Sequence, residues 1–225
     1  MAELVIDLTL TVETALSIGA GGSAGVLADK AIVRNRLGQL VLPGSHLKGR
    51  LRHACEILAR AADLAVCDAP RAETMCPHLG HIPAPCVICQ LFGSASYSSP
   101  LRFADLIYAE PMLTPAIRPG ASINRRRRTV EEQRLFFIET SPPGGLVNFH
   151  RAAAIRGALP SVHAAAQTKL LLAGLCFIQN WGGGKSRGLG WGRIDYQAKL
   201  DETVVQASEL AQAQLELKAQ EAAHA

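Results

Sequence analysis

The sequence predicts one α+β domain of the ferredoxin-like class, because its elements follow the order strand, helix, strand, strand, helix, strand. The chain has 225 residues, of which 48% are hydrophobic and 19% charged, so it is long enough to bury a sizeable core. We expect this domain to span residues 1–200, with inserted segments at about 63–92 and 115–135. Residues 201–225, rich in Ala, Gln and Glu, are expected to form a peripheral C-terminal helix or tail.

The first half of the domain contains strand patterns followed by one helix pattern. Residues 3–12 alternate apolar and polar side chains, which predicts a half-buried strand. Residues 30–35 and 39–42 are expected to form a hairpin, because Gly38 between them can adopt the turn conformation. A helix is then expected to begin with Ser45 as its N-cap and to bury apolar residues at helical spacing.

The second half repeats this alternation of strands and a helix. Its expected elements are a strand at 101–108, strands at 135–140 and 146–150 joined by a turn, a helix from Ser161 to Phe177, and a last strand at 192–196. Residues 118–134 are very polar and lack a core face, so they are expected to form a projecting loop or hairpin arm. A basic arm of this kind typically tracks nucleic acid, and a disordered solvent loop is the alternative.

The positive charges of the chain are clustered and favour an anionic partner. The net charge is +4, but Arg125 to Arg128 form an unbroken run, and Lys48, Arg50 and Arg52 form a second cluster. The sequence begins without a secretory signal pattern, and no apolar run reaches the roughly 18 residues that a membrane-spanning helix requires. We therefore expect a cytoplasmic protein with no membrane partner.

The stretch from Trp181 to Arg193 has the densest glycine content in the chain. Six glycines fall among its thirteen residues, together with Lys185, Ser186 and Arg187. Such a cluster favours close approach of backbone to a ligand, and its N–H groups and cations favour a phosphate chain. The spacing fits neither the phosphate loop of nucleoside triphosphatases nor the dinucleotide fingerprint. An ordinary flexible loop is the alternative.

Four cysteines lie in a stretch with little periodicity, between residues 63 and 92. Cys86 and Cys89 have the C-x-x-C spacing that lets two thiolates bind one tetrahedral zinc, and Cys67 and Cys76 could complete the shell. His78 or His81 could replace a thiolate. The sequence therefore predicts a structural Zn²⁺ that orders this segment, with free thiols or a redox pair as alternatives. Cys55 and Cys176 are expected in the core.

Three motifs, taken together, resemble those of the RAMP superfamily. The run Leu42-Pro43-Gly44-Ser45-His46-Leu47-Lys48-Gly49-Arg50-Leu51-Arg52 looks like its P-G-S-S-x-K-G-x-x-R signature, with His46 where the family usually has Ser. The run Gly183-Gly184-Lys185-Ser186-Arg187-Gly188-Leu189-Gly190 is similar to its C-terminal glycine-rich loop, and Ile18-Gly19-Ala20-Gly21 resembles its N-terminal glycine segment. The cysteine insertion followed by Leu91-Phe92-Gly93 also fits, so the resemblance spans nearly the whole chain.

Within the superfamily the chain most resembles the backbone subunit of type III CRISPR interference complexes. The resemblance implies an RNA-recognition-like fold that polymerises along guide RNA (crRNA) with further copies of itself and other effector subunits. The arm at 118–134 would correspond to the thumb that intercalates between guide and target RNA. The residues expected to bind RNA are then Gly19, Gly21, Ser45, Lys48, Arg50, Arg52, Arg125, Arg126, Arg127, Arg128, Gly183, Gly184, Lys185, Ser186 and Arg187.

Active members of that group cut target RNA with one aspartate on the loop before the P-G-S motif, which implies Asp29 as the catalytic residue of an endoribonuclease. A lone carboxylate can hold Mg²⁺ or another divalent cation beside substrate phosphates, or orient the 2′-hydroxyl for in-line attack. Three alternatives stay open. Asp29 could cap a turn; the subunit could bind crRNA without cutting; or the chain could be a stand-alone zinc protein that binds another anion.

Overall fold

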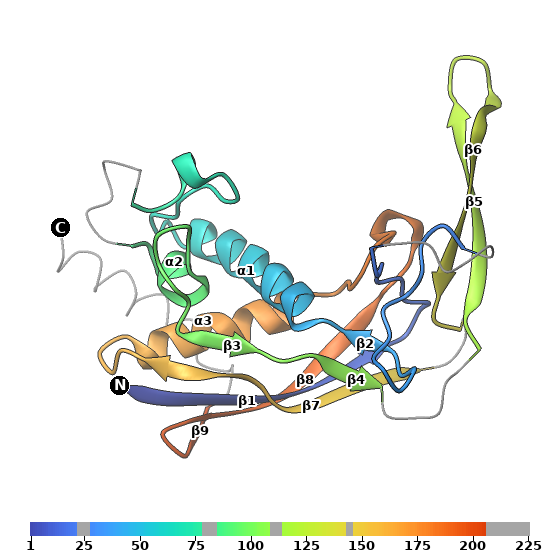
Figure 1. Ribbon diagram of the computed structural model, residues 1–225. Coiled ribbons are helices and arrows are strands. Elements are labelled where there is room, and N and C mark those ends of the chain that lie inside the picture. Colours follow the sequence, from blue (N-terminus) through green and yellow to red (C-terminus); the bar gives the residue numbers. More distant parts are fainter. Residues whose placement is uncertain (22–27, 78–84, 109–113, 143–145, 206–225) are drawn as a thin grey trace.

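The computed structural model describes residues 1–21, 28–77, 85–108, 114–142 and 146–205 (Figure 1). Within these ranges the protein combines antiparallel β-sheet with α-helices, which confirms the α+β class expected from the sequence. His78 and His81, proposed as alternative metal ligands, lie outside the described residues.

Seven strands of the described chain form the main sheet, in the order β2-β4-β7-β1-β8-β9, with β3 also paired to β7. Each neighbouring pair is antiparallel. The strands are β1 (Ala2–Val12), β2 (Val41–Leu42), β3 (Leu101–Phe103), β4 (Leu106–Tyr108), β7 (Val147–Leu159), β8 (Gly192–Leu200) and β9 (Thr203–Val205). Strand β1 contains residues 3–12, whose alternation predicted a half-buried strand.

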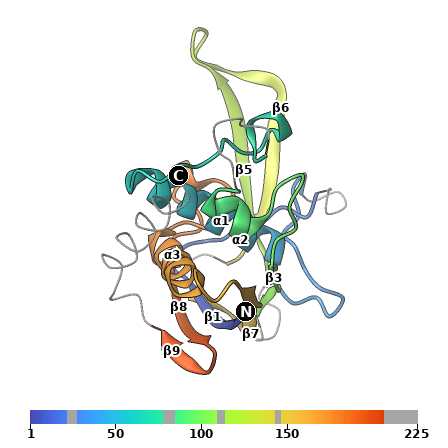
Figure 2. The same ribbon diagram turned by 90° about the vertical axis from the view of Figure 1, so that its left-hand side faces the viewer.

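Helices cover one face of this sheet, as Figures 1 and 2 show. They are α1 (Gly44–Ala61), α2 (Val87–Phe92) and α3 (Ala164–Phe177), with short 3-10 turns η1 (Ala72–Thr74) and η2 (Lys185–Arg187). Leu4, Ile6 and Leu8 of β1 are fully buried beneath the helices. Helices α1 and α3 approach closely at Gly174, where a Cβ would lie 2.7 Å from the Cys55 Sγ.

Helix α1 begins differently from the prediction. Ser45 is exposed and lies inside the helix, and Pro43 precedes the first helical residue without a side-chain cap. The backbone N–H of Gly44 instead donates to Asp105 Oδ1 at 2.8 Å. A carboxylate from a distant loop therefore satisfies the N-terminus of α1 and complements its dipole.

Two other elements form only in part as their sequence patterns predicted. The expected hairpin at 30–42 forms between residues 33 and 41, with Gly38 in its turn: Asn35 N–H donates to the Gln39 carbonyl at 3.0 Å, and Val41 N–H donates to the Val33 carbonyl at 3.2 Å. Farther from the turn, Ile32 pairs instead with Gly19, and Lys30 with Ile138. The expected strand at 101–108 is divided into β3 and β4 at Asp105, the residue that caps α1.

A separate two-stranded sheet, β5 (Ala116–Asn124) and β6 (Thr129–Thr140), forms a long hairpin. It projects well beyond the body of the molecule (Figure 1). Residues 28–30 attach its base to the body: Glu139 N–H donates to the Lys30 carbonyl at 2.9 Å, and Asp29 N–H donates to the Phe137 carbonyl at 3.0 Å. The polar arm is thus an ordered hairpin rather than an unstructured loop.

The later elements correct three further predictions. The second helix begins at Ala164 rather than Ser161, and Cys176 near its end is exposed rather than in the core, whereas Cys55 is buried as expected. The predicted C-terminal helix does not begin at Asp201, because residues 203–205 form β9 and extend the sheet beside β8. Residues 206–225 lie outside the described chain.

Candidate nucleic-acid interface and cysteine cluster

The glycine-rich segment forms a tight loop that is fastened to residues 15–17. Trp181 is fully buried, and its backbone N–H donates to the Gly190 carbonyl at 2.8 Å. Gly183 N–H donates to the Ser17 carbonyl at 2.7 Å, and Gly190 N–H donates to the Ala15 carbonyl at 2.9 Å. A Cβ at Gly182 would lie 2.3 Å from the Ser17 carbonyl oxygen. This close backbone contact requires glycine at position 182.

The same loop contacts the first turns of α1. Gly182 N–H donates to His46 Nε2 at 3.1 Å, and Arg50 Nη2 donates to the Asn180 carbonyl at 3.0 Å. The structure therefore brings together both glycine segments and the start of α1. We call this meeting point of residues 17–21, 45–50 and 180–188 the junction.

Other glycines at the junction leave backbone open to solvent. A Cβ added to Gly19, Gly21, Gly49 or Gly188 would meet nothing within 4 Å. Gly49 lies on α1 between the exposed Ser45 and His53, so the helix backbone is accessible there. Close approach of a ligand to the main chain is possible at these positions.

The junction carries exposed cations beside buried ones. Lys185 and Arg187 are exposed on η2, and the Arg187 guanidinium lies 5.9 Å from the centre of the Phe136 ring at the base of the hairpin. Burial lowers the pKa of Arg50. Burial, and then Arg50 and Lys185, lowers the pKa of His46 to about 4. His46 is therefore neutral at pH 7 and accepts the Gly182 hydrogen bond.

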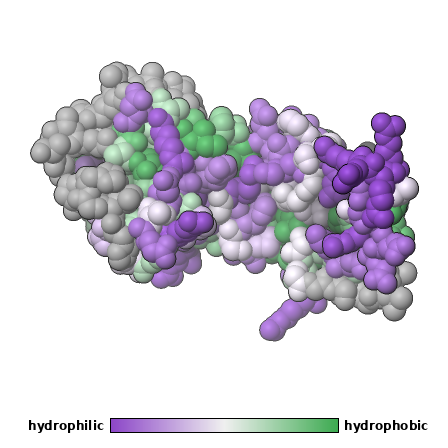
Figure 3. All heavy atoms as spheres, turned by 90° about the horizontal axis from the view of Figure 1, so that it is seen from above, coloured by the Kyte–Doolittle hydropathy of each residue, from purple (hydrophilic) through white to green (hydrophobic). Residues whose placement is uncertain are grey.

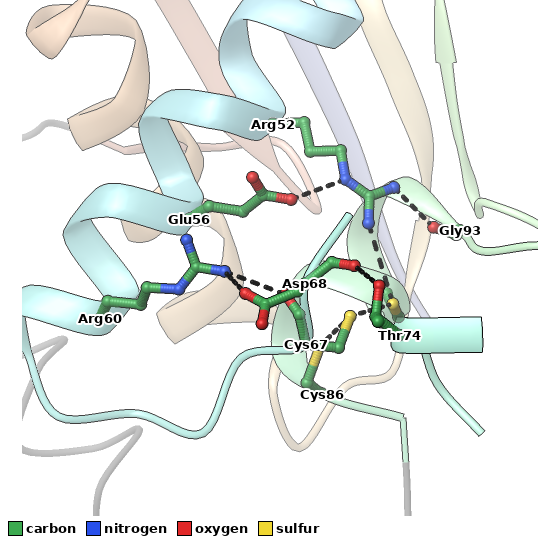
Figure 4. A network of polar contacts seen from close by, with 9 residues as sticks. Arg52, Glu56, Arg60, Cys67, Asp68, Thr74, Cys86 and Gly93 are labelled. Carbon is green, nitrogen blue, oxygen red and sulfur yellow. Dashed lines mark hydrogen bonds and ion pairs between the residues drawn. The ribbon is translucent and has the colours of Figure 1, made fainter. Parts of the chain in front are cut away.

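Arg52, predicted to bind RNA, is used within the protein (Figure 4). Its Nε donates to Glu56 Oε1 at 2.9 Å, its Nη1 to the Gly93 carbonyl at 2.8 Å, and its Nη2 lies 3.9 Å from Cys89 Sγ. The partner Glu56 is buried. The structure thus gives Arg52 the role of joining α1 to the cysteine-rich segment.

Asp29 lies beside the base of the hairpin. It is exposed, and its Oδ2 accepts a hydrogen bond from Phe137 N–H at 2.7 Å. The neighbouring Glu139 is buried, accepts from Ile32 N–H at 2.8 Å and pairs with Arg34 at 2.6 Å. Asp29 and Glu139 therefore fasten residues 28–34 to β6, an anchoring that the sequence did not indicate for Glu139.

The four consecutive arginines occupy the turn at the tip of the β5–β6 hairpin. Arg125–Arg128 are exposed, and Asn124 Oδ1 accepts from the N–H groups of Arg126 and Arg127 at 3.0 Å each. Arg127 also pairs with Glu131 at 3.3 Å. Viewed from above, hydrophilic side chains crowd the end of the molecule that bears the hairpin (Figure 3). This basic tip is displaced from the junction by the length of the hairpin.

Cys67, Cys76, Cys86 and Cys89 are buried together, with their four sulfur atoms within 4.8 Å of one another. The Cys67 and Cys89 sulfurs are 3.3 Å apart, and the Cys86 and Cys67 sulfurs are 3.7 Å apart. Cys86 N–H also points to Cys76 Sγ at 3.4 Å. Four zinc-bound thiolates at about 2.3 Å in tetrahedral geometry would lie about 3.8 Å apart, so this donor set fits zinc.

Open backbone at Gly19, Gly21, Gly49 and Gly188 therefore lies together with the exposed cations of η2, an arrangement that suits an anionic ligand. A model of the RAMP superfamily matches residues 9–193, which is most of the chain. The protein therefore belongs to the RAMP superfamily. A comparison with curated proteins gave no match.

Among the described residues, no helix is both long and apolar enough to span a membrane.

Proposed function

We propose that this protein is a backbone subunit of a type III CRISPR ribonucleoprotein complex, and that its junction binds guide RNA. The observation that carries the proposal is the meeting of both glycine segments with α1, made by the bonds from Gly182 to His46 and from Gly183 to Ser17. Membership of the RAMP superfamily supports an RNA partner. Further copies of the chain and other effector subunits would assemble along the same crRNA, and target RNA would pair with it.

The junction has the chemistry of a phosphate track. Lys185, Ser186 and Arg187 are exposed on η2, and Ser45 is exposed on α1. A sugar-phosphate chain crossing between them would meet cations and hydroxyls, with no side chain at Gly49 to hold it away from the helix. Such contacts would not select bases, because base pairing carries the specificity of guided systems.

The topology of the main sheet supports the ferredoxin-like, RNA-recognition-like form of this fold. Strand β7 lies between β1 and the β3–β4 pair, while β8 lies on the other side of β1. Helix α1 connects β1 to the β3–β4 edge, and α3 connects β7 to β8. This order is the one that a split β-α-β arrangement would have. The cysteine-rich segment and the β5–β6 hairpin would be its two insertions, with the hairpin acting as the thumb.

Binding at the junction is tested with a Lys185→Ala, Arg187→Ala double variant and a labelled single-stranded RNA. Losing two phosphate contacts should weaken binding at least about tenfold and reduce the salt slope by about 2. Arg156→Ala is the matched control, because Arg156 is exposed on β7 outside the junction. Equal binding by the double variant and the wild type would contradict an RNA track here, and RNA-free protein with bound zinc would favour a stand-alone zinc protein.

We further propose that Asp29 cleaves the target RNA, with a non-catalytic guide-binding subunit as the alternative. Its exposed carboxylate beside the hairpin base supports this role. Because Asp29 Oδ2 also anchors Phe137, Asp29→Ala removes both a charge and a structural bond. Asp29→Asn keeps an acceptor oxygen and removes the charge, so it tests catalysis more cleanly. If assembled complexes carrying Asp29→Asn still cut at every position, Asp29 is not the catalytic residue. The chain would then be a guide-binding subunit without a catalytic role.

We predict from the sequence that Mg²⁺ or another divalent cation assists Asp29 in cleaving the target RNA. A cation held by Asp29 and RNA phosphates would supply charge stabilisation at the scissile phosphate. Cleavage by assembled complexes should then stop in EDTA and return when Mg²⁺ is added, while cleavage that continues in EDTA would show that the carboxylate acts without a metal.

We propose that Cys67, Cys76, Cys86 and Cys89 hold one structural Zn²⁺. The four thiols leave no open position for substrate, which favours a structural over a catalytic ion. Purified protein should contain one zinc per chain, and Cys86→Ser should lose it and lower the midpoint of thermal unfolding. Cys176→Ser, at an exposed cysteine outside the cluster, is the matched control. Metal-free protein with unchanged stability would show that the cluster is a set of free thiols.

A further inference from the structure

A groove of about 760 Å³ lies on the side of α1 away from the glycine-rich loop. Lys48 and Arg52 line it from α1, Met75 lines it from the cysteine-rich segment, and residues 93–99 form the opposite wall. Its volume is within the range of sites that bind small ligands or single nucleotides. Among the residues that the structure describes, neither glycine segment lines this groove.

The wall at 93–99 is a fixed loop that presents a tyrosine. Gly93 has a φ of +78°, and a Cβ there would lie 2.7 Å from the Tyr97 carbonyl oxygen, so the turn requires glycine. Ser94 Oγ accepts from Ser96 N–H and Tyr97 N–H at 3.2 Å each, and donates to the Cys76 carbonyl at 3.0 Å. These bonds leave the side chains of Ser96, Tyr97 and Ser98 exposed.

Lys48 is the cation of the groove that is available to a ligand. Its Nζ lies 5.8 Å from the centre of the Phe103 ring, and among the described residues no carboxylate pairs with it. Arg52, in contrast, uses each guanidinium nitrogen on Glu56, Gly93 and Cys89. An incoming anion would therefore meet Lys48, while Arg52 keeps the groove wall attached to α1.

The groove continues the surface of the junction across α1. Helical spacing places His46 and Arg50 on the flank that faces the glycine-rich loop, and Lys48 on the opposite flank. The open backbone of Gly49 lies between these two flanks. A chain that leaves the glycine-rich loop and crosses α1 at Gly49 would enter the groove.

We propose that this groove binds one nucleotide of the single-stranded RNA that crosses α1, with its phosphate at Lys48 and its base against the Tyr97 ring. The inference rests on the proposed function. Bases stack on exposed aromatic rings without regard to sequence, and the exposed hydroxyls of Ser96 and Ser98 suit the 2′-hydroxyl of RNA. The protein would thus contact RNA on both flanks of α1.

The test uses the full chain and a labelled single-stranded RNA that contains 4-thiouridine. We expect a photo-crosslink between RNA and Tyr97, and about tenfold weaker binding by Tyr97→Ala and by Lys48→Ala. Tyr97→Phe and Lys48→Arg retain the ring and the charge and should bind RNA nearly as the wild type does. The Lys185→Ala, Arg187→Ala double variant reports separately on the junction.

The outcomes separate the two proposals. If the double variant loses RNA while Tyr97→Ala and Lys48→Ala bind as the wild type does, the groove proposal is overturned and the junction stands. If 4-thiouridine RNA gives no crosslink to Tyr97 and Tyr97→Ala instead weakens association between copies of the chain, measured by sedimentation, the groove is a protein interface and the proposal is also overturned. If the wild-type protein does not bind RNA, both the junction proposal and the groove proposal are overturned.

Discussion

The junction and the tip of the β5–β6 hairpin are both basic, but their cations are held differently. At the junction, Arg50 donates to the Asn180 carbonyl, and next to it Arg52 pairs with the buried Glu56. At the tip, Arg125–Arg128 occupy an exposed turn. A cluster of cations in the sequence is therefore not in itself a binding surface, because partners contributed by distant residues decide which cations are free.

The glycines of the glycine-rich loop should show the largest effect on stability. Gly190 has a φ of +73°, and a Cβ there would lie 1.8 Å from the Trp181 carbonyl oxygen. Gly190→Ala should therefore lower the free energy of unfolding by more than about 4 kcal/mol, measured by urea denaturation. Gly188→Ala is the control: its φ is +78°, but its Cβ would be in open space. It should cost only about 1 kcal/mol.

Breaking the Arg52 network should have the next largest effect. Arg52→Ala leaves Glu56 buried without its partner, and the pair is mostly shielded from solvent, with side-chain exposures of 17% and 10%. The free energy of unfolding should fall by about 2–3 kcal/mol. Arg52→Lys retains the charge but not the three-way hydrogen bonding, and should give an intermediate loss. If Arg52→Ala is as stable as the wild type, the Arg52 network does not stabilise the fold, and Arg52 would be available to a ligand.

His46 should make the junction sensitive to acid. Its pKa is lowered to about 4, firstly by burial and then by Arg50 and Lys185. In the pH window from about 6.5 down to 4 the unfolded chain binds a proton that the folded chain does not. Above pH 6.5 the neutral His46 therefore does not lower the free energy of unfolding. As the pH falls from 6.5 to 4, this free energy decreases by up to about 3 kcal/mol.

His46→Gln tests this assignment, because glutamine offers a neutral acceptor to Gly182 N–H at every pH. The slope of unfolding free energy against pH between 4 and 6.5 should become shallower in the variant, as measured by urea denaturation at successive pH values. Identical slopes in the two proteins would show that His46 is not the group responsible.

The hairpin tip should show the smallest effect on stability. Replacing Arg125, Arg126 and Arg128 by Ala, while keeping Arg127 with its partner Glu131, should change the free energy of unfolding by less than about 0.5 kcal/mol. RNA binding should become less salt-dependent by about one unit of slope for each arginine that contacts phosphate. A marked loss of stability would contradict the contrast between tip and junction.

Local patterns in the sequence were enough to predict much of this structure. The alternation along residues 3–12 predicts β1, the apolar spacing after residue 44 predicts α1, and the low apolar content of 118–134 predicts an arm outside the core. The four cysteines assemble as their spacing and composition suggested. These features depend on side-chain periodicity and composition within a short window, which any folded form of the chain must satisfy.

The sequence alone did not reveal which member of each motif contacts which partner. Gly190 packs on Trp181 while Gly188 stays open, Asp105 rather than Ser45 satisfies the start of α1, and Arg52 is directed to Glu56 and Cys89. Other contacts also join residues far apart in the chain: Asp105 lies 61 positions from Gly44, and Gly182 lies 136 positions from His46. Only tertiary packing brings such groups within hydrogen-bonding distance, so it alone determines which glycines are open and which cations are free.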